Sequence, residues 1–263
     1  MGVEGMQVLR SRLEDICDRR DGVAFGIASV DQADALPRVK IGYTYNRYTK
    51  PLRSGMPEAR SVIIYGVPSV DDSDELAVER SPDKWTYPGY FPLNMIARDI
   101  IKELRGFGYK AAYPSELASH KRLAILAGIG AYGKNSLVIS PRHGPWLRFG
   151  VVVTDVELPV DKPFTKDLCG RCRRCVSACP AGALKPYEVD ADRCIVGASI
   201  RTKVPPSMMD LIRQNEPRLT PKTHVMCTKC QLVCPYTSSQ RRRNVVHAPV
   251  SARPKSRGKR KRA

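Results

Sequence analysis

The sequence has no long hydrophobic run: nowhere do about eighteen apolar residues follow one another, so no membrane-spanning helix is predicted. The N-terminus lacks the apolar segment of a secretory signal, and Met6 stands where a myristoylation motif needs Ser or Thr. These absences predict a cytoplasmic protein with no membrane partner. Thiols stay reduced in that compartment, so clustered cysteines favour metal binding over disulfides.

Acidic and aromatic residues are both missing from residues 241–263, which hold ten Lys or Arg. The net charge of the whole chain is +18, so residues 1–240 carry +8. This composition predicts a disordered basic tail that is solvated. A tail that contacts RNA or another polyanion is the alternative, although no aromatic ring is present there to stack on bases.

The remaining composition, 42% hydrophobic and 27% charged, indicates a globular protein. Apolar residues recur at helical spacing in three segments, 6–20, 92–108 and 116–128. Strands are predicted for 22–30, 61–70, 109–115, 135–140 and 146–158, the last two joined across PRHGP. The acidic segment 71–83 is expected to be a loop.

This alternation of helices and strands predicts an α/β or α+β layer domain over residues 1–159. Nearly all the cysteines come later, so we expect a small second domain over 160–240 and the disordered tail over 241–263. Cys17, alone on the first helix, is expected to pack in the core.

The other eight cysteines are Cys169, Cys172, Cys175, Cys179, Cys194, Cys227, Cys230 and Cys234. The run CGRCRRCVSACP has the C-x2-C-x2-C-x3-C-P spacing of bacterial ferredoxins, which bind [4Fe–4S] clusters. The run CTKCQLVCP is one cysteine shorter, and Cys194 can supply the missing ligand. Eight thiolates are the complement of two cubane clusters, so the sequence predicts an electron conduit.

In two-cluster ferredoxins the fourth cysteine of the first run binds the other cube. By this analogy one cluster is held by Cys169, Cys172, Cys175 and Cys234. The other is held by Cys179, Cys194, Cys227 and Cys230. A zinc site built from Cys169, Cys172, Cys227 and Cys230 is an alternative that leaves four cysteines without a role. Neither run contains His, so a Rieske centre has no support.

The stretch GIGAYG, residues 128–133, matches the pattern GxGxxG. The dinucleotide-binding fingerprint follows a strand, whereas this stretch follows a predicted helix. A tight turn at the end of that helix is the simpler interpretation.

Over residues 57–236 the order of several motifs resembles the superfamily of epoxyqueuosine reductases and reductive dehalogenases. The similarity is carried by PEARSVIIYGVP, AGIGAYGKN, the strand that leads into TDVELP, and LCGRCRRCVSACPAGAL. The resemblance implies a nitroreductase-like N-terminal domain followed by a small ferredoxin-like module with two clusters, and a cobalamin near one cluster. Electrons would come from a low-potential donor of the ferredoxin or flavodoxin type and pass through the clusters to cobalt.

Candidate residues for such a cofactor are Gly128, Gly130, Gly133, Lys134 and Asn135. The glycines permit close approach to the backbone, and the two polar side chains can donate to phosphate or amide groups. Tyr87 and Tyr90 are candidate proton donors, provided that their pKa is lowered. Packing beneath the helix that starts near Pro92 is the alternative for both rings.

Two places depart from the pattern of epoxyqueuosine reductases. Pro114 stands where they have an acidic Asp, and Ile100 and Ile101 stand where they have Tyr and His.

The leading hypothesis is an iron–sulfur reductase with a corrinoid-type cofactor and an unknown small organic substrate. The alternatives are an electron-transfer protein without its own cofactor, and RNA modification of the epoxyqueuosine reductase type that uses the basic tail.

Overall fold

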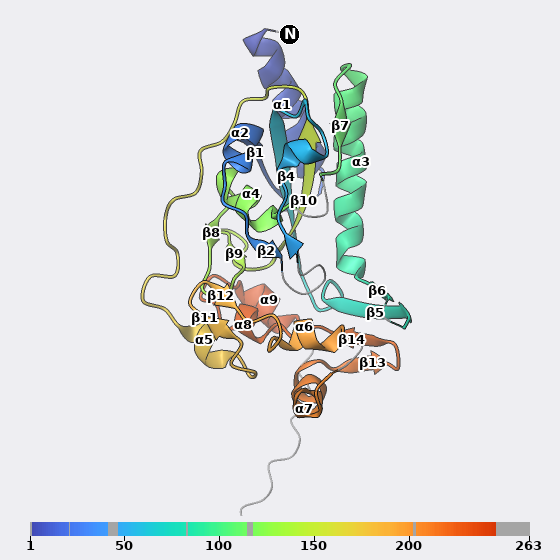
Figure 1. Ribbon diagram of the computed structural model, residues 1–263, viewed down its shortest axis with the longest axis vertical. Helices are drawn as coiled ribbons and strands as arrows, with labels where there is room; N and C mark the ends of the chain where they lie inside the picture. The colour runs from blue at the N-terminus through green and yellow to red at the C-terminus, as the bar shows by residue number, and fades with distance from the viewer. Residues whose placement is uncertain are drawn as a thin grey trace, which may run out of the picture.

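The computed structural model describes residues 2–20, 22–41, 47–82, 84–114, 118–201 and 204–245. Figure 1 shows a sheet flanked by helices in the upper part of the molecule and short helices and hairpins in the lower part, where the cysteine-rich segments lie. Within the described residues, no helix is long and apolar enough to cross a membrane.

The central sheet is antiparallel and consists of β1 (Ala24–Ser29), β4 (Ser61–Pro68), β10 (Leu147–Thr154) and β7 (Ala111–Ala112), in the order β1-β4-β10-β7. Side chains alternate between the two faces of a strand. Accordingly Ile63 and Tyr65 of β4 enter one apolar core, and Val62 and Ile64 enter the other. Both faces of the sheet therefore need a cover of helices.

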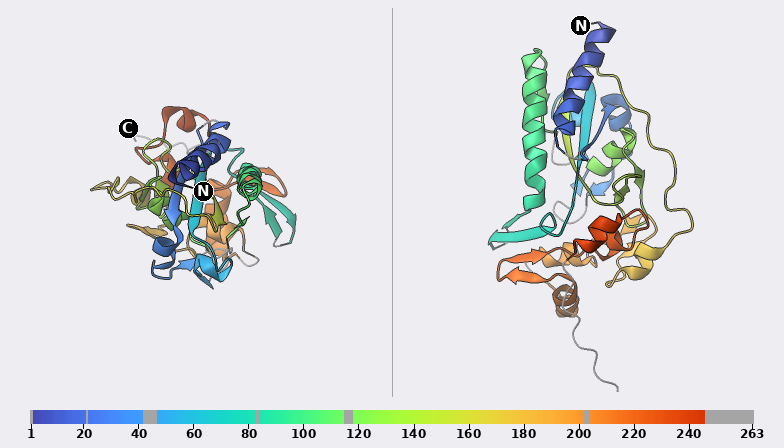
Figure 2. Two further views of the ribbon diagram at one scale, coloured as in Figure 1. Left: turned by 90° about the horizontal axis from the view of Figure 1, so that it is seen from above. Right: turned by 180° about the vertical axis from the view of Figure 1, so that it is seen from behind.

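One face is covered by α1 (Val3–Asp18) and α3 (Phe91–Gly106), which lie side by side in Figure 2. The other face is covered by α2 (Val30–Asp34), the short η1 (Leu52–Ser54) and α4 (His120–Leu126). The layered α/β arrangement that the alternation predicts is confirmed. A closer relation to nitroreductases stays a prediction.

A second sheet joins the two halves of the chain. Its strands are β13 (Arg218–Thr220), β14 (Thr223–Val225), β5 (Leu76–Ser81) and β6 (Lys84–Thr86), in that order. The prediction of a loop over 71–83 is wrong for β5. Its partner β14 lies between the two cysteine runs, far along the chain, and a local pattern cannot reveal such a pairing. Backbone hydrogen bonds thus cross the expected division near residue 160.

The remaining short elements are β2 (Lys40–Ile41), β3 (Arg47–Tyr48), η2 (Pro88–Tyr90), β8 (Ala131–Tyr132), β9 (Val138–Ile139), α5 (Arg174–Ala178), β11 (Leu184–Lys185), β12 (Glu188–Val189), α6 (Ile195–Ser199), α7 (Pro206–Asn215), α8 (Lys229–Leu232) and α9 (Ser239–Arg243). The two strands expected on either side of PRHGP lie in different sheets, because β9 pairs with β8 and β10 pairs with β4.

An extended connection leads from β10 to the first cysteines and runs along the outside of the layered domain (Figure 1). The Arg10 guanidinium donates to the Asp161 carboxylate at 2.8 Å, and the Ile27 N–H donates to the same carboxylate at 2.8 Å. Farther along, the Phe164 N–H donates to the Ile125 carbonyl at 2.9 Å. These bonds fix the path by which the first cysteine loop reaches its position.

The prediction of a disordered tail is wrong at its start, because Arg241 lies within α9 and is 3% exposed. Its guanidinium donates to Asp72 at 3.1 Å and lies 3.9 Å from the ring centroid of Trp146. The Trp146 indole in turn donates to Thr237 at 2.9 Å. A carboxylate and an aromatic ring from distant segments therefore order a residue that composition places in solvent. Residues 246–263 lie outside the described residues.

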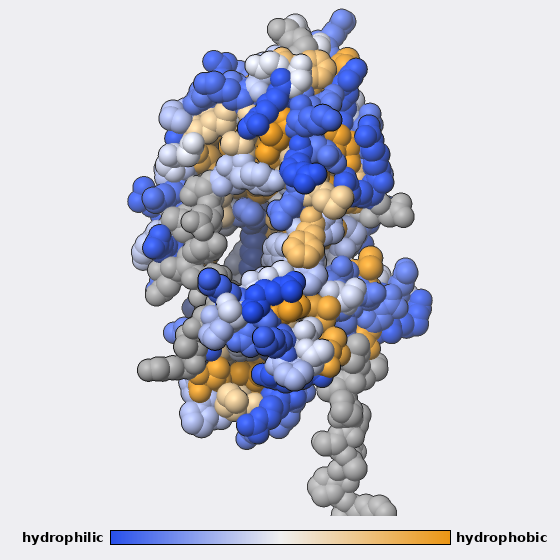
Figure 3. All heavy atoms as spheres, turned by 90° about the vertical axis from the view of Figure 1, so that its right-hand side faces the viewer, coloured by the Kyte–Doolittle hydropathy of each residue, from blue (hydrophilic) through white to orange (hydrophobic). Residues whose placement is uncertain are grey.

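The surface on the α3 side is mainly hydrophilic. Figure 3 shows several separate apolar spots among charged and polar side chains. Met95 and Phe107 of this region are 53% and 40% exposed. Scattered apolar residues of this kind are ordinary on a globular protein, so they indicate no binding surface.

Candidate metal centre

The eight clustered cysteines lie on short elements in the lower part of the molecule. Cys169 and Cys172 precede α5, Cys175 lies in α5, and Cys234 follows α8. The other four are Cys179 at the end of α5, Cys194 at the start of α6, Cys227 between β14 and α8, and Cys230 in α8. Turns and single helical turns bring sulfur atoms together here, and Gly170 supports the first turn with a φ of 44°.

The thiols fall into two neighbouring groups. Burial raises the pKa of Cys234, and the nearby Cys169, Cys175 and Cys172 raise it further. Burial likewise raises the pKa of Cys230, with Cys227, Cys194 and Cys179 as its main neighbours. The structure thus brings together the two sets of four that the ferredoxin spacing predicts. Cys175 also acts on Cys230, so the two groups are adjacent.

The chemistry of these groups fits iron–sulfur clusters. All eight cysteines are free thiols, and burial, together with neighbouring sulfurs and Glu216, raises the pKa of Cys227 to about 12. Several crowded thiols can ionise together only when cations neutralise them, as cluster irons do. The zinc alternative would need Cys169 and Cys172 of the first group to meet Cys227 and Cys230 of the second around one ion. In the described ranges, no three His, Cys, Asp or Glu side chains converge on one ion position. A cubane instead offers a separate iron to each thiolate.

An apolar cover lies over the second group. Cys179, Cys194 and Cys227 pack against a small cluster formed by Ala181, Ala183, Ile195, Met208, Leu211 and Ile212. The last three belong to α7, which therefore covers one side of this group, while its four cysteines stay partly exposed. Shielding and hydrogen bonds to sulfur are the means by which a protein sets the potential of a cluster. The Ala183 N–H, 3.3 Å from the Cys179 sulfur, supplies one such bond.

Lys134 connects the layered domain to the first cysteine loop and is 8% exposed. Its backbone N–H lies 3.4 Å from the Cys169 sulfur. Its ammonium donates to the carbonyls of Gly170 and Cys172, the latter at 3.0 Å. Of the five residues predicted to bind an organic cofactor, this one instead holds the cluster loop.

The other four predicted cofactor residues also face the protein itself. Gly128 ends α4 with a φ of 74°, and a Cβ there would lie 2.8 Å from the Lys162 carbonyl oxygen. A Cβ on Gly130 would lie 2.4 Å from the Ile139 carbonyl oxygen, and one on Gly133 would lie 2.6 Å from the Ile139 side chain. The Asn135 side chain accepts the Leu137 N–H at 3.3 Å. These residues close a turn and do not fit a corrinoid cradle.

The two candidate proton donors lie beside each other at the start of α3. The rings of Tyr87 and Tyr90 meet edge to face, with centroids 6.1 Å apart. Burial, and then the charges of Tyr90 and Glu216, raise the pKa of Tyr87. The lowered pKa required for proton donation is therefore not met at Tyr87. Tyr90 lies beneath the Arg148 guanidinium, 5.4 Å from its ring centroid, and is 47% exposed.

Sequence reasoning missed an acid beside the second group. Glu216 is 1% exposed, and its carboxylate accepts the Cys227 N–H at 3.0 Å. His224 lies opposite, with its Nε2 3.3 Å from the carboxylate. Burial raises the pKa of Glu216 to about 7 and lowers the pKa of His224 to about 4. The β13–β14 hairpin brings the two side chains together. A prediction of that hairpin from the sequence would have placed Glu216 and His224 side by side.

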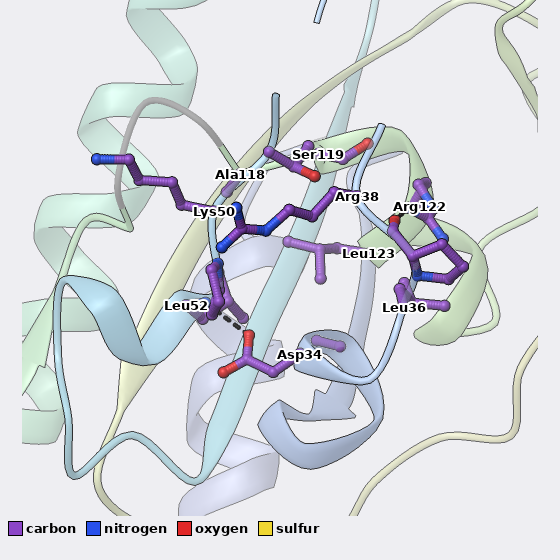
Figure 4. A pocket seen from close by; sticks show the side chains of 13 residues that line it. Asp34, Leu36, Arg38, Lys50, Leu52, Ala118, Ser119, Arg122 and Leu123 are labelled. Carbon is purple, nitrogen blue, oxygen red and sulfur yellow. Dashed lines mark hydrogen bonds between the residues drawn. The ribbon is translucent and has the colours of Figure 1, made fainter. Parts of the chain in front are cut away.

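A separate small pocket lies between α2, η1 and α4. Figure 4 shows Arg38, Lys50 and Arg122 around it, and Asp34 accepting the Leu52 N–H, a bond of 2.6 Å. The pocket offers about 70 Å³. Sites for cofactors and other ligands usually span about 300–1,000 Å³, so the described walls do not form a corrinoid-sized cavity.

Comparison with known proteins defines the class of the cysteine-rich region. Residues 168–237 match the family of 4Fe-4S double cluster binding domains. All eight clustered cysteines fall within this range. The chain therefore contains a 4Fe-4S double-cluster domain on the C-terminal side of a layered α/β domain.

Over most of its length the chain has the fold of epoxyqueuosine reductases and reductive dehalogenases. An epoxyqueuosine reductase from Bacillus subtilis superposes with a TM-score of 0.66 at 20% identity, over 90% of this chain and 67% of that one. An epoxyqueuosine reductase solved with a modified tRNA-Tyr stem loop gives 0.67 at 20% identity, with the same shares of the two chains covered. A reductive dehalogenase gives 0.54 at 17% identity, over 84% of this chain and 30% of that one.

Two curated relatives, both epoxyqueuosine reductases, match part of the chain. The epoxyqueuosine reductase of Pseudomonas aeruginosa is 35% identical over 147 residues, which are 55% of this chain and 38% of that protein. That of Synechococcus sp. (strain RCC307) is 36% identical over 166 residues, 62% of this chain and 46% of that protein. The chain thus spans less than half the length of these two relatives.

Proposed function

We propose that this chain is an iron–sulfur reductase of the epoxyqueuosine reductase type. In this proposal two [4Fe–4S] clusters receive single electrons from a ferredoxin or flavodoxin and pass them toward the layered domain. The observation that carries it is the gathering of eight free cysteines into two adjacent groups of four. The names of the curated relatives support a modified RNA nucleoside as substrate, ahead of a small organic molecule.

The two cysteine groups would act as neighbouring stations for electrons. Cys175 of the first group and Cys230 of the second lie close enough for their charges to interact. A cluster in each group would let an electron move between them within the protein. The apolar side chains of α7 line one side of the second group and so lower the polarity along that route.

The side chains at positions 100, 101 and 114, where epoxyqueuosine reductases have Tyr, His and Asp, cannot supply the protons that a reduction needs. Ile100, at one of the positions where the relatives' pattern has Tyr and His, is 0% exposed in the core. Ile101 packs against the same core. Pro114 has no acidic side chain. Solvent water is therefore the proton source in this proposal.

The test is an anaerobic assay of the reconstituted chain with a reduced flavodoxin and an epoxyqueuosine-containing tRNA stem loop, with and without added cobalamin. We expect conversion to queuosine in at least one arm, detected by mass spectrometry of the nucleosides. Loaded, reducible clusters without conversion in either arm would contradict the reductase proposal and favour an electron-transfer protein.

A further inference from the structure

The Arg242 side chain binds the loop that carries Cys234, a member of the first cysteine group. Its guanidinium donates to the carbonyls of Leu232 at 2.8 Å, Cys234 at 2.7 Å and Thr237 at 3.2 Å. Leu232 ends α8, and the last carbonyls of a helix have no partner within it. A guanidinium has five N–H donors in a fixed fork, so it can satisfy three carbonyls at once. Arg242 therefore fixes the turn that presents Cys234.

Lys134 makes the corresponding contacts with the other loop of the first group. Its ammonium donates to the Cys172 carbonyl at 3.0 Å, and its backbone N–H lies 3.4 Å from the Cys169 sulfur. Lys134 comes from the turn between β8 and β9, whereas Arg242 comes from α9. Both residues lie outside 168–237, the range that matches the double-cluster family. Each loop of the first group is thus held by a cation from outside that range.

The helix that carries Arg242 is attached to the layered domain. Arg241, the preceding residue, pairs with Asp72 at 3.1 Å, and the Asn244 side chain donates to the Val70 carbonyl at 3.2 Å. Successive side chains of a helix point about 100° apart, so one residue can reach the layered domain while the next reaches the cysteine loop. Through α9 the loop is therefore fixed relative to the layered domain.

The first group depends on such polar contacts more than the second group does, because the apolar cluster of this region packs against the second. A cubane takes four thiolates only when their loops hold the sulfurs around one cluster. Hydrogen bonds from charged donors are roughly twice as strong as neutral ones, which suits them to fixing a loop. Groups that orient metal ligands typically change metal affinity by about 10–100-fold.

We propose that Arg242 and Lys134 are positioning residues of the first cluster, one for each of its two loops. This inference rests on the proposed binding of two clusters. Neither side chain is an iron ligand. They hold the Cys234 turn and the run from Cys169 to Cys175 in place for the cluster. They also bring positive charge close to it, which stabilises the reduced cluster because reduction adds a negative charge.

The test follows iron release to a ferrous-iron chelator from the reconstituted full chain under anaerobic conditions. Arg242→Met and Lys134→Met remove the donors and the charge, and Arg242→Lys keeps the charge with fewer donors. Arg243→Met, at an exposed position of the same helix, is the matched control with the same change in net charge. Redox titration followed by electron paramagnetic resonance gives the potential of each cluster, and Cys234→Ser identifies the signal of the first.

We expect about four of the eight irons to leave 10–100 times faster in both Met variants, while the second cluster keeps its wild-type rate. Arg242→Lys should be intermediate, and Arg243→Met should match wild type. Before iron is lost, the potential of the first cluster should fall in the Met variants by at least about 59 mV, a tenfold change for one electron. Arg242→Lys should keep the wild-type potential.

Wild-type iron release from both Met variants would overturn the inference, as would equally fast loss of both clusters. The same first-cluster potential in wild type and in both Met variants would also contradict it. Absence of clusters from the reconstituted wild type would instead reject the proposed function.

Discussion

The layered domain and the cysteine-rich region are stabilised in different ways. The first buries two continuous apolar cores, one on each side of a sheet. The second has one small apolar cluster and otherwise contains short elements that surround thiols. A region with so little apolar core depends on bound metal for folding, whereas the layered domain does not. The two regions should therefore respond oppositely to loss of metal and to core mutations.

Removal of iron is expected to have the largest effect. In Cys175→Ser/Cys230→Ser, one ligand is lost from each group, so the segment 168–237 should lose its ordered structure while the layered domain remains folded. Limited proteolysis with mass spectrometry locates the newly cleaved sites. Cys17→Ala is the control, because Cys17 is buried between α1 and the sheet and is no cluster ligand. Cleavage spread evenly over both regions would contradict the comparison.

The contact between the regions should be nearly as sensitive. Arg241→Met removes the guanidinium that pairs with Asp72 and lies over Trp146, and breaking a buried ion pair costs about 3–5 kcal/mol. We expect a large fall in the free energy of unfolding, measured by urea denaturation under anaerobic conditions. Arg243→Met, at an exposed position of the same helix, should change it by no more than about 0.5 kcal/mol. Equal values for the two variants would show that the buried pair does not join the regions.

A core substitution should destabilise the layered domain alone. Ile96 is 0% exposed between α3 and the sheet, so Ile96→Ala should cost about 2–5 kcal/mol. Iron content should stay at the wild-type level. Met95→Ala, on the exposed side of α3, is the matched control. A parallel loss of iron in the Ile96 variant would mean that the two regions do not have separate sources of stability.

The smallest effect concerns pH. The pKa of Glu216 is raised to about 7 in the folded chain, so its stabilising contribution is full below its ordinary value and is lost as pH rises through 7. The pKa of His224 is lowered to about 4, so its contribution is complete above its ordinary value of 6.5. Of these two groups, only Glu216 should therefore change the stability between about pH 6.5 and 8. The thermal midpoint should therefore fall more steeply in wild type than in Glu216→Gln, and parallel curves would contradict this.

The predictable parts of the molecule are those whose signal is local. Helical spacing located α1 and α3, β-branched runs located β4 and β10, and cysteine spacing anticipated both sulfur groups. Contacts between distant segments left no such signal. The strand β5 depends on β14, and the burial of Arg241 depends on Asp72 and Trp146.

The glycine turn shows a further limit. The pattern from Gly128 to Asn135 suggests a surface for a ligand, because glycine and polar residues suit both ligand binding and tight turns. The structure uses these residues to bring Lys134 to the first cysteine loop. Sequence spacing alone cannot separate these two uses, since both require backbone atoms to approach closely.

The most direct test of the account is a count of iron and acid-labile sulfide in anaerobically reconstituted chain, combined with Mössbauer spectroscopy. We expect about eight irons and eight sulfides per chain, all in cubane environments. Cys194→Ser should alter the spectrum of one cluster and leave the other unchanged. About four irons or fewer in intact wild type, or zinc in their place, would contradict the central claim that these eight cysteines hold two clusters.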